Sequence, residues 1–523
     1  MLKSPVPYGL AIHARLKRDL LLGMIATCAL LYAWMFTQGA PNERSRVYLS
    51  VALIDQGTVH IDESLRRFGY TFDLATHGNH FYTDKAPGSS FLGALVYGAL
   101  RIFSSPEDWS IHALIQWMRW GLMIPITLIG FFILRDLLRT LNIQEPIIDI
   151  SSLAWLFGSA AFHYGRAFYG HQIVAICLLS ALWLVFPAPR HRMRLRWCAA
   201  GMLCGFATLT EYQAAIPCIV FAGFGLWQAY RCNALRTWWL FCLGTLPSVI
   251  AFCLYHHTAF GGVFELSYHH LVNEQTRQLH SQGIGGVLFP QWKFLGGLLF
   301  SLHRGLITTS PWVLFAIVGL RAYFRDTSKE YRGTAWLMLL VLVYFIVFTS
   351  SSNMWFAGWS FGPRLLVPVL PWLSVLAAFG MQHAWHHATT RALALGSVTI
   401  SIVYYQLVNI TFAELPPEAN NPILDTVMPL LQGHQLIPNW SWQLTGRGDA
   451  WSTLPFALLI SAVLVWIFRQ GLVGISYSKW KITCGAMACV VPLILAIVIR
   501  GPAWDETQRS KFVQDVQIWS YEG

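Results

Sequence analysis

The chain has 523 residues, of which 55% are hydrophobic and only 12% are charged, and its mean hydropathy is +0.48. Soluble globular domains carry about a quarter charged residues, so this composition excludes an ordinary soluble domain and indicates a polytopic membrane protein. The formal net charge of +11 would also suit a nucleic-acid partner, so the distribution of the charge has to decide between the two interpretations.

Apolar runs long enough to cross a bilayer recur along the whole chain. The first, residues 20–37, follows a basic start. It lacks the small-residue cleavage pattern of a signal peptide, so we interpret it as a retained helix. The other predicted spans lie near residues 110–134, 148–163, 172–187, 197–212, 213–229, 237–255, 305–320, 334–350, 365–382, 392–409, 453–468 and 482–499. Together they predict an all-α polytopic membrane protein with about 13 transmembrane helices.

Residues 89–103 form a further, ambiguous apolar run of about 15 residues, which is a short length for a span. If this run lies in the membrane interface, the basic clusters of the chain fall in the loops on one side, as the positive-inside rule requires. We therefore predict an interfacial helix here, a cytoplasmic N-terminus and an exoplasmic C-terminus. The positive charge then reflects topology and predicts no nucleic-acid partner.

This topology suggests two membrane modules, residues 1–260 and 261–523. The first contains an exoplasmic loop of residues 38–103. The second contains exoplasmic loops 260–303, 351–364 and 411–452 and an exoplasmic tail of residues 500–523. The cytoplasmic loops are short and contain no nucleotide-binding motif, so we expect chemistry on the exoplasmic face with a membrane-borne or already activated substrate.

The first loop begins with an amphipathic segment. Asn42 can cap a helix, Glu43 would lie in its first turn, and Arg46 shares the face of Glu43. Such a helix would lie flat at the interface and point Glu43 along the membrane surface. Two roles remain open for Glu43: a catalytic carboxylate, or a residue that only complements the helix dipole.

The first loop ends in Tyr82-Thr83-Asp84-Lys85-Ala86-Pro87-Gly88. Pro87 and Gly88 predict a rigid turn that holds Lys85 at headgroup depth, where an ammonium group can bind a lipid phosphate. Ordinary snorkelling of an interfacial lysine is the alternative. The neighbouring Asp84 and Tyr82 favour a site.

Further exoplasmic cations lie at the ends of predicted spans, among them Arg166, Arg304 and Arg364. Several guanidinium groups at one surface suit bidentate phosphate recognition, although any one of them could be an interface anchor. Trp355 and Trp359 either stack on a sugar or belong to the aromatic belt.

Glu211 interrupts an apolar stretch at the outer end of a span and is a functional candidate on that ground. The pairs His256-His257 and His269-His270 lack a third ligand at a convincing spacing, so no metal site is predicted. The ten cysteines show no metal-binding spacing either. No cofactor is predicted, and nothing in the sequence supports a divalent metal.

The chain resembles the GT-C superfamily of integral-membrane glycosyltransferases, in particular the branch of protein O-mannosyltransferases and lipid A aminoarabinose transferases. The resemblance rests on the retained first helix, the early acidic residue of the loop, the interfacial helix and the Tyr-x-Asp-Lys-x-Pro-Gly turn, and it is strongest over residues 20–260. Two features depart from the pattern. Asn42-Glu43 stands where relatives commonly have an Asp-Glu pair, and Tyr169-Gly170-His171 stands where the mannosyltransferases have an acidic residue.

The resemblance implies an inverting glycosyltransferase of the exoplasmic face, in a cell membrane such as the bacterial inner membrane. It would use a polyprenyl-phosphate-linked sugar and a lipid, glycan or protein acceptor. Glu43 would be the general base and Asp84 its alternative. The residues expected to bind the donor phosphate are Lys85, Arg304, Arg364 and Tyr82, and further substrate contacts are expected from Arg46, Arg166, His171, Glu211, Trp355 and Trp359. A flippase or transporter of polyprenyl-linked or other glycolipids is the alternative, but such a protein should carry mid-span charges and internal repeats.

Overall fold

The computed structural model describes residues 8–32, 39–186, 193–231, 235–283, 285–326, 329–432, 436, 439–446, 450–473 and 503–521. Helices dominate these residues, and two short strands form a single antiparallel sheet. The predicted span 482–499 lies outside the described residues.

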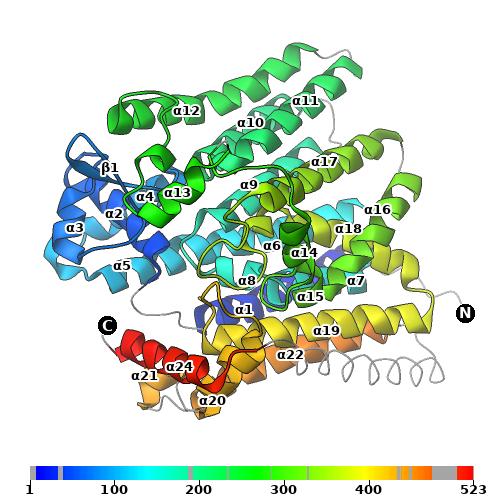
Figure 1. Cartoon of the computed structure of the whole chain (residues 1–523). Coiled ribbons are helices and arrows are strands. Elements are labelled where there is room, and N and C mark those ends of the chain that lie inside the picture. The colour runs from blue at the N-terminus through cyan, green and yellow to red at the C-terminus, as the bar shows by residue number, and fades with distance from the viewer. Residues whose placement is uncertain are drawn as a thin grey trace, which may run out of the picture.

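The first loop folds into a compact group at one end of the molecule, coloured blue in Figure 1. Its elements are α2 (Pro41–Asp55), α3 (Asp62–Phe68), β1 (Leu74–His77), β2 (His80–Thr83) and α4 (Gly88–Arg101). β1 and β2 pair with Leu74 opposite Thr83 and His77 opposite His80. Gly78 and Asn79 connect them with φ of 56° and 67°, the left-handed conformation that a tight hairpin turn requires. This hairpin was not predicted from the sequence.

α4 packs lengthwise on α2, where Ser50 Oγ donates a hydrogen bond to the Ser90 carbonyl at 2.9 Å. α4 has 14 residues, and a helix of that length extends about 21 Å, short of the roughly 30 Å of a bilayer core. The length of α4 therefore agrees with a helix that does not cross the membrane.

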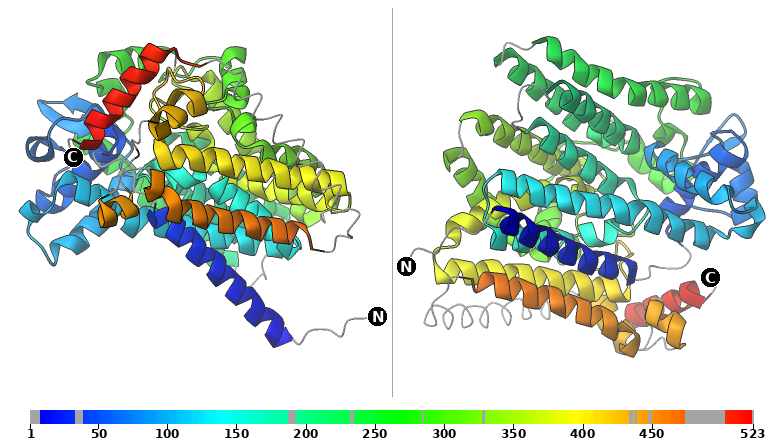
Figure 2. Two further views of the ribbon diagram at one scale, coloured as in Figure 1. Left: turned by 90° about the horizontal axis from the view of Figure 1, so that it is seen from below. Right: turned by 180° about the vertical axis from the view of Figure 1, so that it is seen from behind.

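The other helices form an elongated bundle, and α24 lies at the same end of the bundle as the first-loop group, while α1 begins at the opposite end (Figures 1 and 2). The helices of the first half are α1 (Tyr8–Tyr32), α5 (Ile111–Met118), α6 (Ile124–Thr140), α7 (Glu145–Phe157), α8 (Ala161–Tyr164), α9 (Gly170–Val185), α10 (Met193–Thr210), α11 (Ala215–Arg231) and α12 (Leu235–Phe260). Those of the second half are α13 (Glu274–Ser281), α14 (Trp292–Phe300), α15 (Leu306–Thr309), α16 (Phe315–Asp326), α17 (Lys329–Ser351), α18 (Leu370–Ala384), α19 (Ala388–Thr411), α20 (Met428–Gln432), α21 (Trp440–Thr445), α22 (Leu454–Gly471) and α24 (Glu506–Tyr521).

Six of the predicted spans coincide with helical segments that are long and apolar enough to cross a membrane. These segments are Ile111–Thr140, Trp238–Phe260, Arg332–Ser351, Arg364–Ala384, Ala388–Thr411 and Trp451–Gly471. The fold class, an all-α polytopic membrane protein, is thereby confirmed. The total of 13 spans, like the orientation of the termini, stays a prediction.

Two predicted spans are wrong as continuous helices. In residues 305–320, α15 ends at Thr309 and α16 begins only at Phe315, because Pro311 cannot donate the hydrogen bond that would continue the helix. In residues 148–163, α7 ends at Phe157. Hydrogen bonds join the two breaks, because Ser310 Oγ and Trp312 Nε1 donate to the Gly158 carbonyl at 3.0 and 2.8 Å. Irregular backbone within a membrane protein is tolerated where neighbouring groups pair it in this way.

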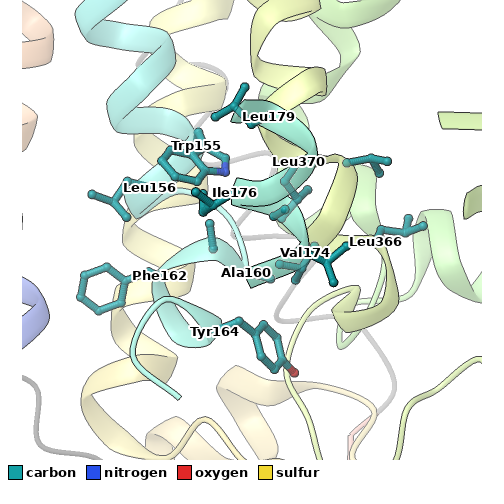
Figure 3. Close-up of a cluster of buried hydrophobic side chains, with 14 of the residues drawn as sticks. Trp155, Leu156, Ala160, Phe162, Tyr164, Val174, Ile176, Leu179, Leu366 and Leu370 are labelled. Carbon is teal, nitrogen blue, oxygen red and sulfur yellow. The ribbon is translucent and has the colours of Figure 1, made fainter. Parts of the chain in front are cut away.

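The buried core continues across residue 260, the predicted boundary between the two modules. Figure 3 shows Trp155 of α7, Tyr164 of α8 and Ile176 of α9 in one cluster with Leu366 and Leu370. Ser374 Oγ of α18 also donates to the Ser151 carbonyl at 2.9 Å. The division into modules stays a prediction, and the two halves share their interior.

At the end of α6 remote from the first loop, a buried ion-pair network joins α1, α6, α7 and α22. The fully buried Arg135 donates to Asp149 Oδ1 at 2.8 Å and to Asp19 Oδ1 at 2.6 Å. The other oxygen of Asp149 accepts from Arg18 Nε and Trp466 Nε1, both at 2.7 Å. Removing one partner from a buried pair costs far more than removing an exposed one, because a desolvated charge is left behind.

We therefore expect Asp149→Asn to destabilise the protein by about 3 kcal/mol, toward the lower end of the range for broken buried pairs because Asp19 still faces Arg135. Thermal unfolding of the purified protein in detergent measures the change. Glu145→Gln is the matched control. It breaks the partly exposed pair with Arg139, for which we expect at most about 1 kcal/mol. Equal losses in the two variants would contradict the prediction.

Candidate functional site

α2 begins earlier than predicted. Its first residue is Pro41 and its N-cap is Ala40, whereas Asn42 lies inside the first turn and accepts a hydrogen bond from Arg46 Nε at 2.9 Å. Proline is well suited to the first helical position because its missing N–H would be unpaired there and its φ is already helical. The predicted capping role of Asn42 is therefore wrong, and the residue orients Arg46 instead.

Glu43 is completely buried, so the prediction that it points along the membrane surface is wrong. Its Oε1 accepts from Arg119 Nε at 2.9 Å and from the Phe168 N–H at 2.8 Å. Its Oε2 accepts from Arg119 Nη2 and from the Ala40 N–H. Both oxygens are thus occupied, and the carboxylate fastens α2 to the short π-helical turn Arg119–Met123 and to the segment that leads into α9.

The electrostatics of Glu43 follow from these contacts. Burial by itself raises the pKa of a carboxyl group, but the Arg119 guanidinium and the two backbone N–H donors outweigh it. The pKa of Glu43 therefore lies below its ordinary value, and the group is a permanently ionised, weakly basic carboxylate.

Lys85 lies between two carboxylates. Its Nζ is 2.9 Å from Asp84 Oδ2 and 3.0 Å from Asp73 Oδ2. These neighbours outweigh the effect of burial and raise the pKa of Lys85. Asp73 was not identified from the sequence. Its signal was the hairpin: because Leu74 pairs with Thr83, the residue before Leu74 comes next to the residues that follow Thr83.

Asp84 has the opposite electrostatic character to Glu43. It is buried, and its Oδ1 makes no hydrogen bond within the described residues. Burial raises its pKa, Lys85 lowers it and Asp73 raises it again, with a balance at about 6. Asp84 can therefore exchange a proton near neutral pH, which Glu43 cannot.

Arg46 connects this turn to the membrane bundle. The side chain is almost fully buried, and its Nη2 lies 2.9 Å from Glu211 Oε1, at the end of α10. Its Nη1 donates to Ser89 Oγ and, at 3.4 Å, to the carbonyl of Ala86. Arg46 thereby links the residue after Lys85 to Glu211 through a single guanidinium group.

Glu211 in turn reaches the start of α9. Its Oε1 is 4.0 Å from His171 Nδ1, and a Cβ at Gly170 would lie 2.1 Å from the same oxygen, so only glycine permits this approach. His171 Nε2 accepts from Arg364 Nε at 2.9 Å. Arg46, Glu211, His171 and Arg364 thus form a polar path of neighbouring side chains from α2 to the 3-10 turn Arg364–Val369, which leads into α18.

Arg364 differs from the other cations of this path. Its guanidinium lies 4.4 Å from the centre of the Tyr169 ring and donates to the Ala357 carbonyl at 3.1 Å. Among the described residues, no carboxylate lies within 4.0 Å of it, whereas Arg46 and Lys85 are both paired. Arg364, like Arg304, therefore makes no ion pair within 4.0 Å in the described structure, although Glu414 and Glu211 stabilise its charge from a greater distance.

Arg304 supports the loop against which Arg364 packs. Its Nε donates to the Phe356 carbonyl at 2.7 Å and its Nη2 to the Gly358 carbonyl at 2.9 Å. Burial lowers the pKa of Arg304 to about 10, so it remains charged at neutral pH. Its Nη1 also lies 2.9 Å from His303 Nδ1, and most of its hydrogen bonds go to backbone carbonyls, which suits a residue that shapes the loop.

The remaining predicted residues lie around this path. Tyr82 packs with its ring centre 5.2 Å from that of Phe260, and Trp355 stacks on Phe294 at 6.0 Å. Arg166 is buried and donates to Asn409 Oδ1 at 3.2 Å, and Trp359 is 42% exposed. Their substrate contacts stay predictions.

Two further residues near Arg364, Tyr169 and Glu414, were not among the predicted site residues. Tyr169, whose ring Arg364 covers, donates to Glu414 Oε1 at 3.2 Å, and the same oxygen lies 3.2 Å from His163 Nε2. Glu414 comes from the predicted loop 411–452. Nothing in the sequence near Glu414 indicates this contact, because it depends on how α19 ends beside the start of α9.

The raised pKa of Asp84 predicts a pH-dependent stability. Between about pH 4 and pH 6 the folded protein holds a proton on Asp84 that the unfolded chain releases, so the free energy of unfolding should fall as pH rises through this window. A shift of this size corresponds to something on the order of 3 kcal/mol. Asp84→Asn should remove this contribution and flatten the curve of melting temperature against pH.

Glu63→Gln, at an exposed carboxylate of α3, is the control and should retain the wild-type slope. Parallel pH profiles for wild type and Asp84→Asn would contradict the assigned pKa.

No protein-family model matches the chain, and no curated protein sequence matches it. Solved structures do resemble it in fold. ArnT from Cupriavidus metallidurans in the apo state is 14% identical, with 92% of this chain and 78% of that chain covered and a TM-score of 0.47. The Archaeoglobus fulgidus oligosaccharyltransferase is 12% identical over 85% of this chain and 59% of that chain, with a TM-score of 0.49.

The arabinosyltransferase EmbB from Mycobacterium smegmatis is 12% identical over 95% of this chain and 42% of its own length, with a TM-score of 0.43. A second ArnT structure, bound to undecaprenyl phosphate, is similar with a TM-score of 0.46. The names of these structures include an oligosaccharyltransferase and an arabinosyltransferase.

Proposed function

We propose that the protein is a glycosyltransferase that moves a sugar from a polyprenyl-phosphate-linked donor to an acceptor hydroxyl on the exoplasmic face of the membrane. The observation that carries the proposal is the polar path of Arg46, Glu211, His171 and Arg364, which Arg46 joins to the turn of Asp84 and Lys85 through the Ala86 carbonyl. The members of the path come from α2, the end of α10, the start of α9 and the 3-10 turn Arg364–Val369. One site thereby holds a titratable carboxylate and several cations.

Arg364 is the leading candidate for the donor phosphate. A phosphate is bound strongly by a guanidinium that no carboxylate already pairs, and Arg364 has no carboxylate within 4.0 Å among the described residues. Lys85 would contribute less at the outset, because it faces both Asp73 and Asp84. Protonation of Asp84 would release part of the Lys85 charge toward a phosphate. Arg304 supports the loop of Ala357 and Gly358 and would act on the donor only through Arg364.

Asp84 is the better candidate for the general base. A base works best when its pKa lies near the working pH, and Asp84 has a pKa of about 6 and one oxygen without a hydrogen-bond donor in the described structure. Glu43 accepts four hydrogen bonds and is closed to solvent. We assign Glu43 a positioning role, holding α2 so that Arg46, one turn later, reaches Glu211.

The proposed step is a single inverting displacement. Asp84 accepts the proton of the acceptor hydroxyl while the hydroxyl oxygen forms a bond to the anomeric carbon. The bond from that carbon to the phosphate oxygen breaks, and its electron pair leaves with the polyprenyl phosphate. Preorganised cations stabilise the charge that develops on the leaving group, first Arg364 and then Lys85.

The function is tested by incubating purified protein with a panel of radiolabelled polyprenyl-phosphate sugars and following the release of free polyprenyl phosphate. We expect one donor to be consumed, and Arg364→Gln to lower kcat/KM for it by at least about tenfold, the size of a lost charged hydrogen bond. Arg321→Gln, at an exposed arginine of α16, should leave the rate unchanged. Movement of intact lipid-linked sugar across proteoliposomes without cleavage would overturn the enzyme in favour of a flippase.

The base is tested by comparing Asp84→Asn with Glu43→Gln. We expect Asp84→Asn to fold and to lower kcat by about 10² to 10⁴, the usual contribution of a general base. Glu43→Gln should mainly lower the melting temperature, because the buried Arg119 loses its ionised partner. A folded Glu43→Gln protein without activity, beside an active Asp84→Asn protein, would return the role of base to Glu43.

A further inference from the structure

Two histidines and an aspartate converge on the surface of the first-loop group, outside the polar path. Asp62 Oδ2 is 2.5 Å from His80 Nδ1 and 3.0 Å from His60 Nδ1. The ligand atoms of the three residues all lie within 4.8 Å of one another. The two imidazole rings stack with their centres 4.4 Å apart.

The local fold prepares these residues for a common ligand. The Phe81 N–H donates to Asp62 Oδ1 at 2.7 Å, which fixes the carboxylate and leaves Oδ2 toward the two rings. The Ile61 N–H donates to the Phe81 carbonyl at 2.8 Å, so the segment before α3 is tied to β2. Hydrogen bonds that orient a ligand from behind are typical of protein metal sites.

The bonding of His60 is incomplete without a further partner. Its Nδ1 is buried and makes no hydrogen bond within the described residues, although Asp62 Oδ2 is only 3.0 Å away. The ring nitrogen and the carboxylate oxygen are thus within ion-pair distance of each other but lack the geometry of a hydrogen bond. A cation between them would be bonded to both.

The distances suit a small transition-metal ion. Tetrahedral Zn²⁺ holds nitrogen and oxygen ligands at about 2.0 to 2.2 Å, which separates the ligand atoms from each other by roughly 3.4 Å. The observed separations of 2.5 and 3.0 Å need to open by less than about 1 Å to reach this geometry. The side chains are between 24% and 50% exposed, so an ion can enter and a water can complete the coordination.

We propose that His60, Asp62 and His80 form a binding site for a divalent transition metal, best fitted by Zn²⁺. The bound ion would fasten the segment between α2 and α3 to strand β2. Because two of the three ligands are imidazole nitrogens, Mg²⁺ and Ca²⁺ are not the preferred ions, since those ions select oxygen donors. The site is independent of the proposed transferase activity, because none of its residues belongs to the polar path.

The test uses the full-length protein in detergent, without a polyhistidine tag and freed of metal by a chelator that is then removed. Titration with ZnCl₂ against a chromophoric chelator, with metal content checked by mass spectrometry, should give one tightly bound Zn²⁺ per chain. His60→Gln and His80→Gln should each weaken binding at least tenfold, since even residues behind a metal ligand contribute about that much. Millimolar Mg²⁺ should not compete.

Two further variants separate metal binding from folding. Asp62→Asn retains an oxygen for the Phe81 N–H and so preserves the hairpin contact, yet it should lose zinc affinity. His257→Gln, at an exposed histidine of α12, should bind zinc as the wild type does. ZnCl₂ should raise the melting temperature of wild type and His257→Gln only. Equal zinc binding in wild type, His60→Gln and His80→Gln, or less than one zinc per wild-type chain, would overturn the site.

Discussion

The ion pair of Glu43 with Arg119 is the contact on which the arrangement of this site depends. It is buried from solvent on both sides, and the same carboxylate holds the Phe168 N–H. Three separate parts of the chain, α2, the π-helical turn and the approach to α9, are thereby fixed at one point. Arg46 follows Glu43 by one helical turn, and His171 follows Phe168 by three residues. The contacts of Glu43 therefore also position Arg46 and His171, the two residues on either side of Glu211. A desolvated pair of this kind adds little net stability against an apolar replacement, but breaking it is costly, which makes it suited to specifying one arrangement.

Around this point the charges are distributed unequally. Asp73, Asp84 and Lys85 form a group with more negative than positive charge, and the excess is relieved by a raised pKa at Asp84. Arg364, which no described carboxylate approaches within 4.0 Å, lies at the other end of the polar path. Arg46 and Glu211 compensate each other and connect the two regions. A reaction that takes up a proton at one place and releases a phosphate at another needs charged groups that their neighbours do not fully neutralise.

The broken helices near Gly158 and Pro311 are a second constraint on the interior of the bundle. At these breaks Ser310 and Trp312 donate hydrogen bonds to the buried Gly158 carbonyl, so the irregular backbone is paired inside the bundle.

Residues of the same type at similar places in the chain also differ in what their side chains contact. Glu43 and Asp84 are both acidic residues at the ends of the first loop, yet opposite surroundings give them opposite tendencies to ionise. Arg304 and Arg364 are both cations before predicted spans, yet their contacts differ. Arg304 bonds the Phe356 and Gly358 carbonyls and its neighbour His303, whereas Arg364 covers the Tyr169 ring and donates to His171 and the Ala357 carbonyl. Residue type and position in the chain do not distinguish the members of these pairs, because the difference lies in what each side chain contacts.

The sequence by itself determined the membrane class, six of the long apolar helices and a helix in the first loop, although α2 begins at Pro41 and not after Asn42. It singled out the turn at Asp84 and Lys85 as a candidate site. These features depend on local composition, on hydrophobic run length and on turn residues, all of which act over a few neighbouring positions. It also identified Arg46, His171, Glu211 and Arg364 as separate candidates. Only the tertiary structure joined them, buried Glu43 against Arg119, brought Asp73 to Lys85 and gathered His60, Asp62 and His80. Each of these contacts joins residues that lie on different elements, and burial and ion pairing across such contacts decide which carboxylate stays ionised, which cation stays unpaired and which histidines can share a ligand.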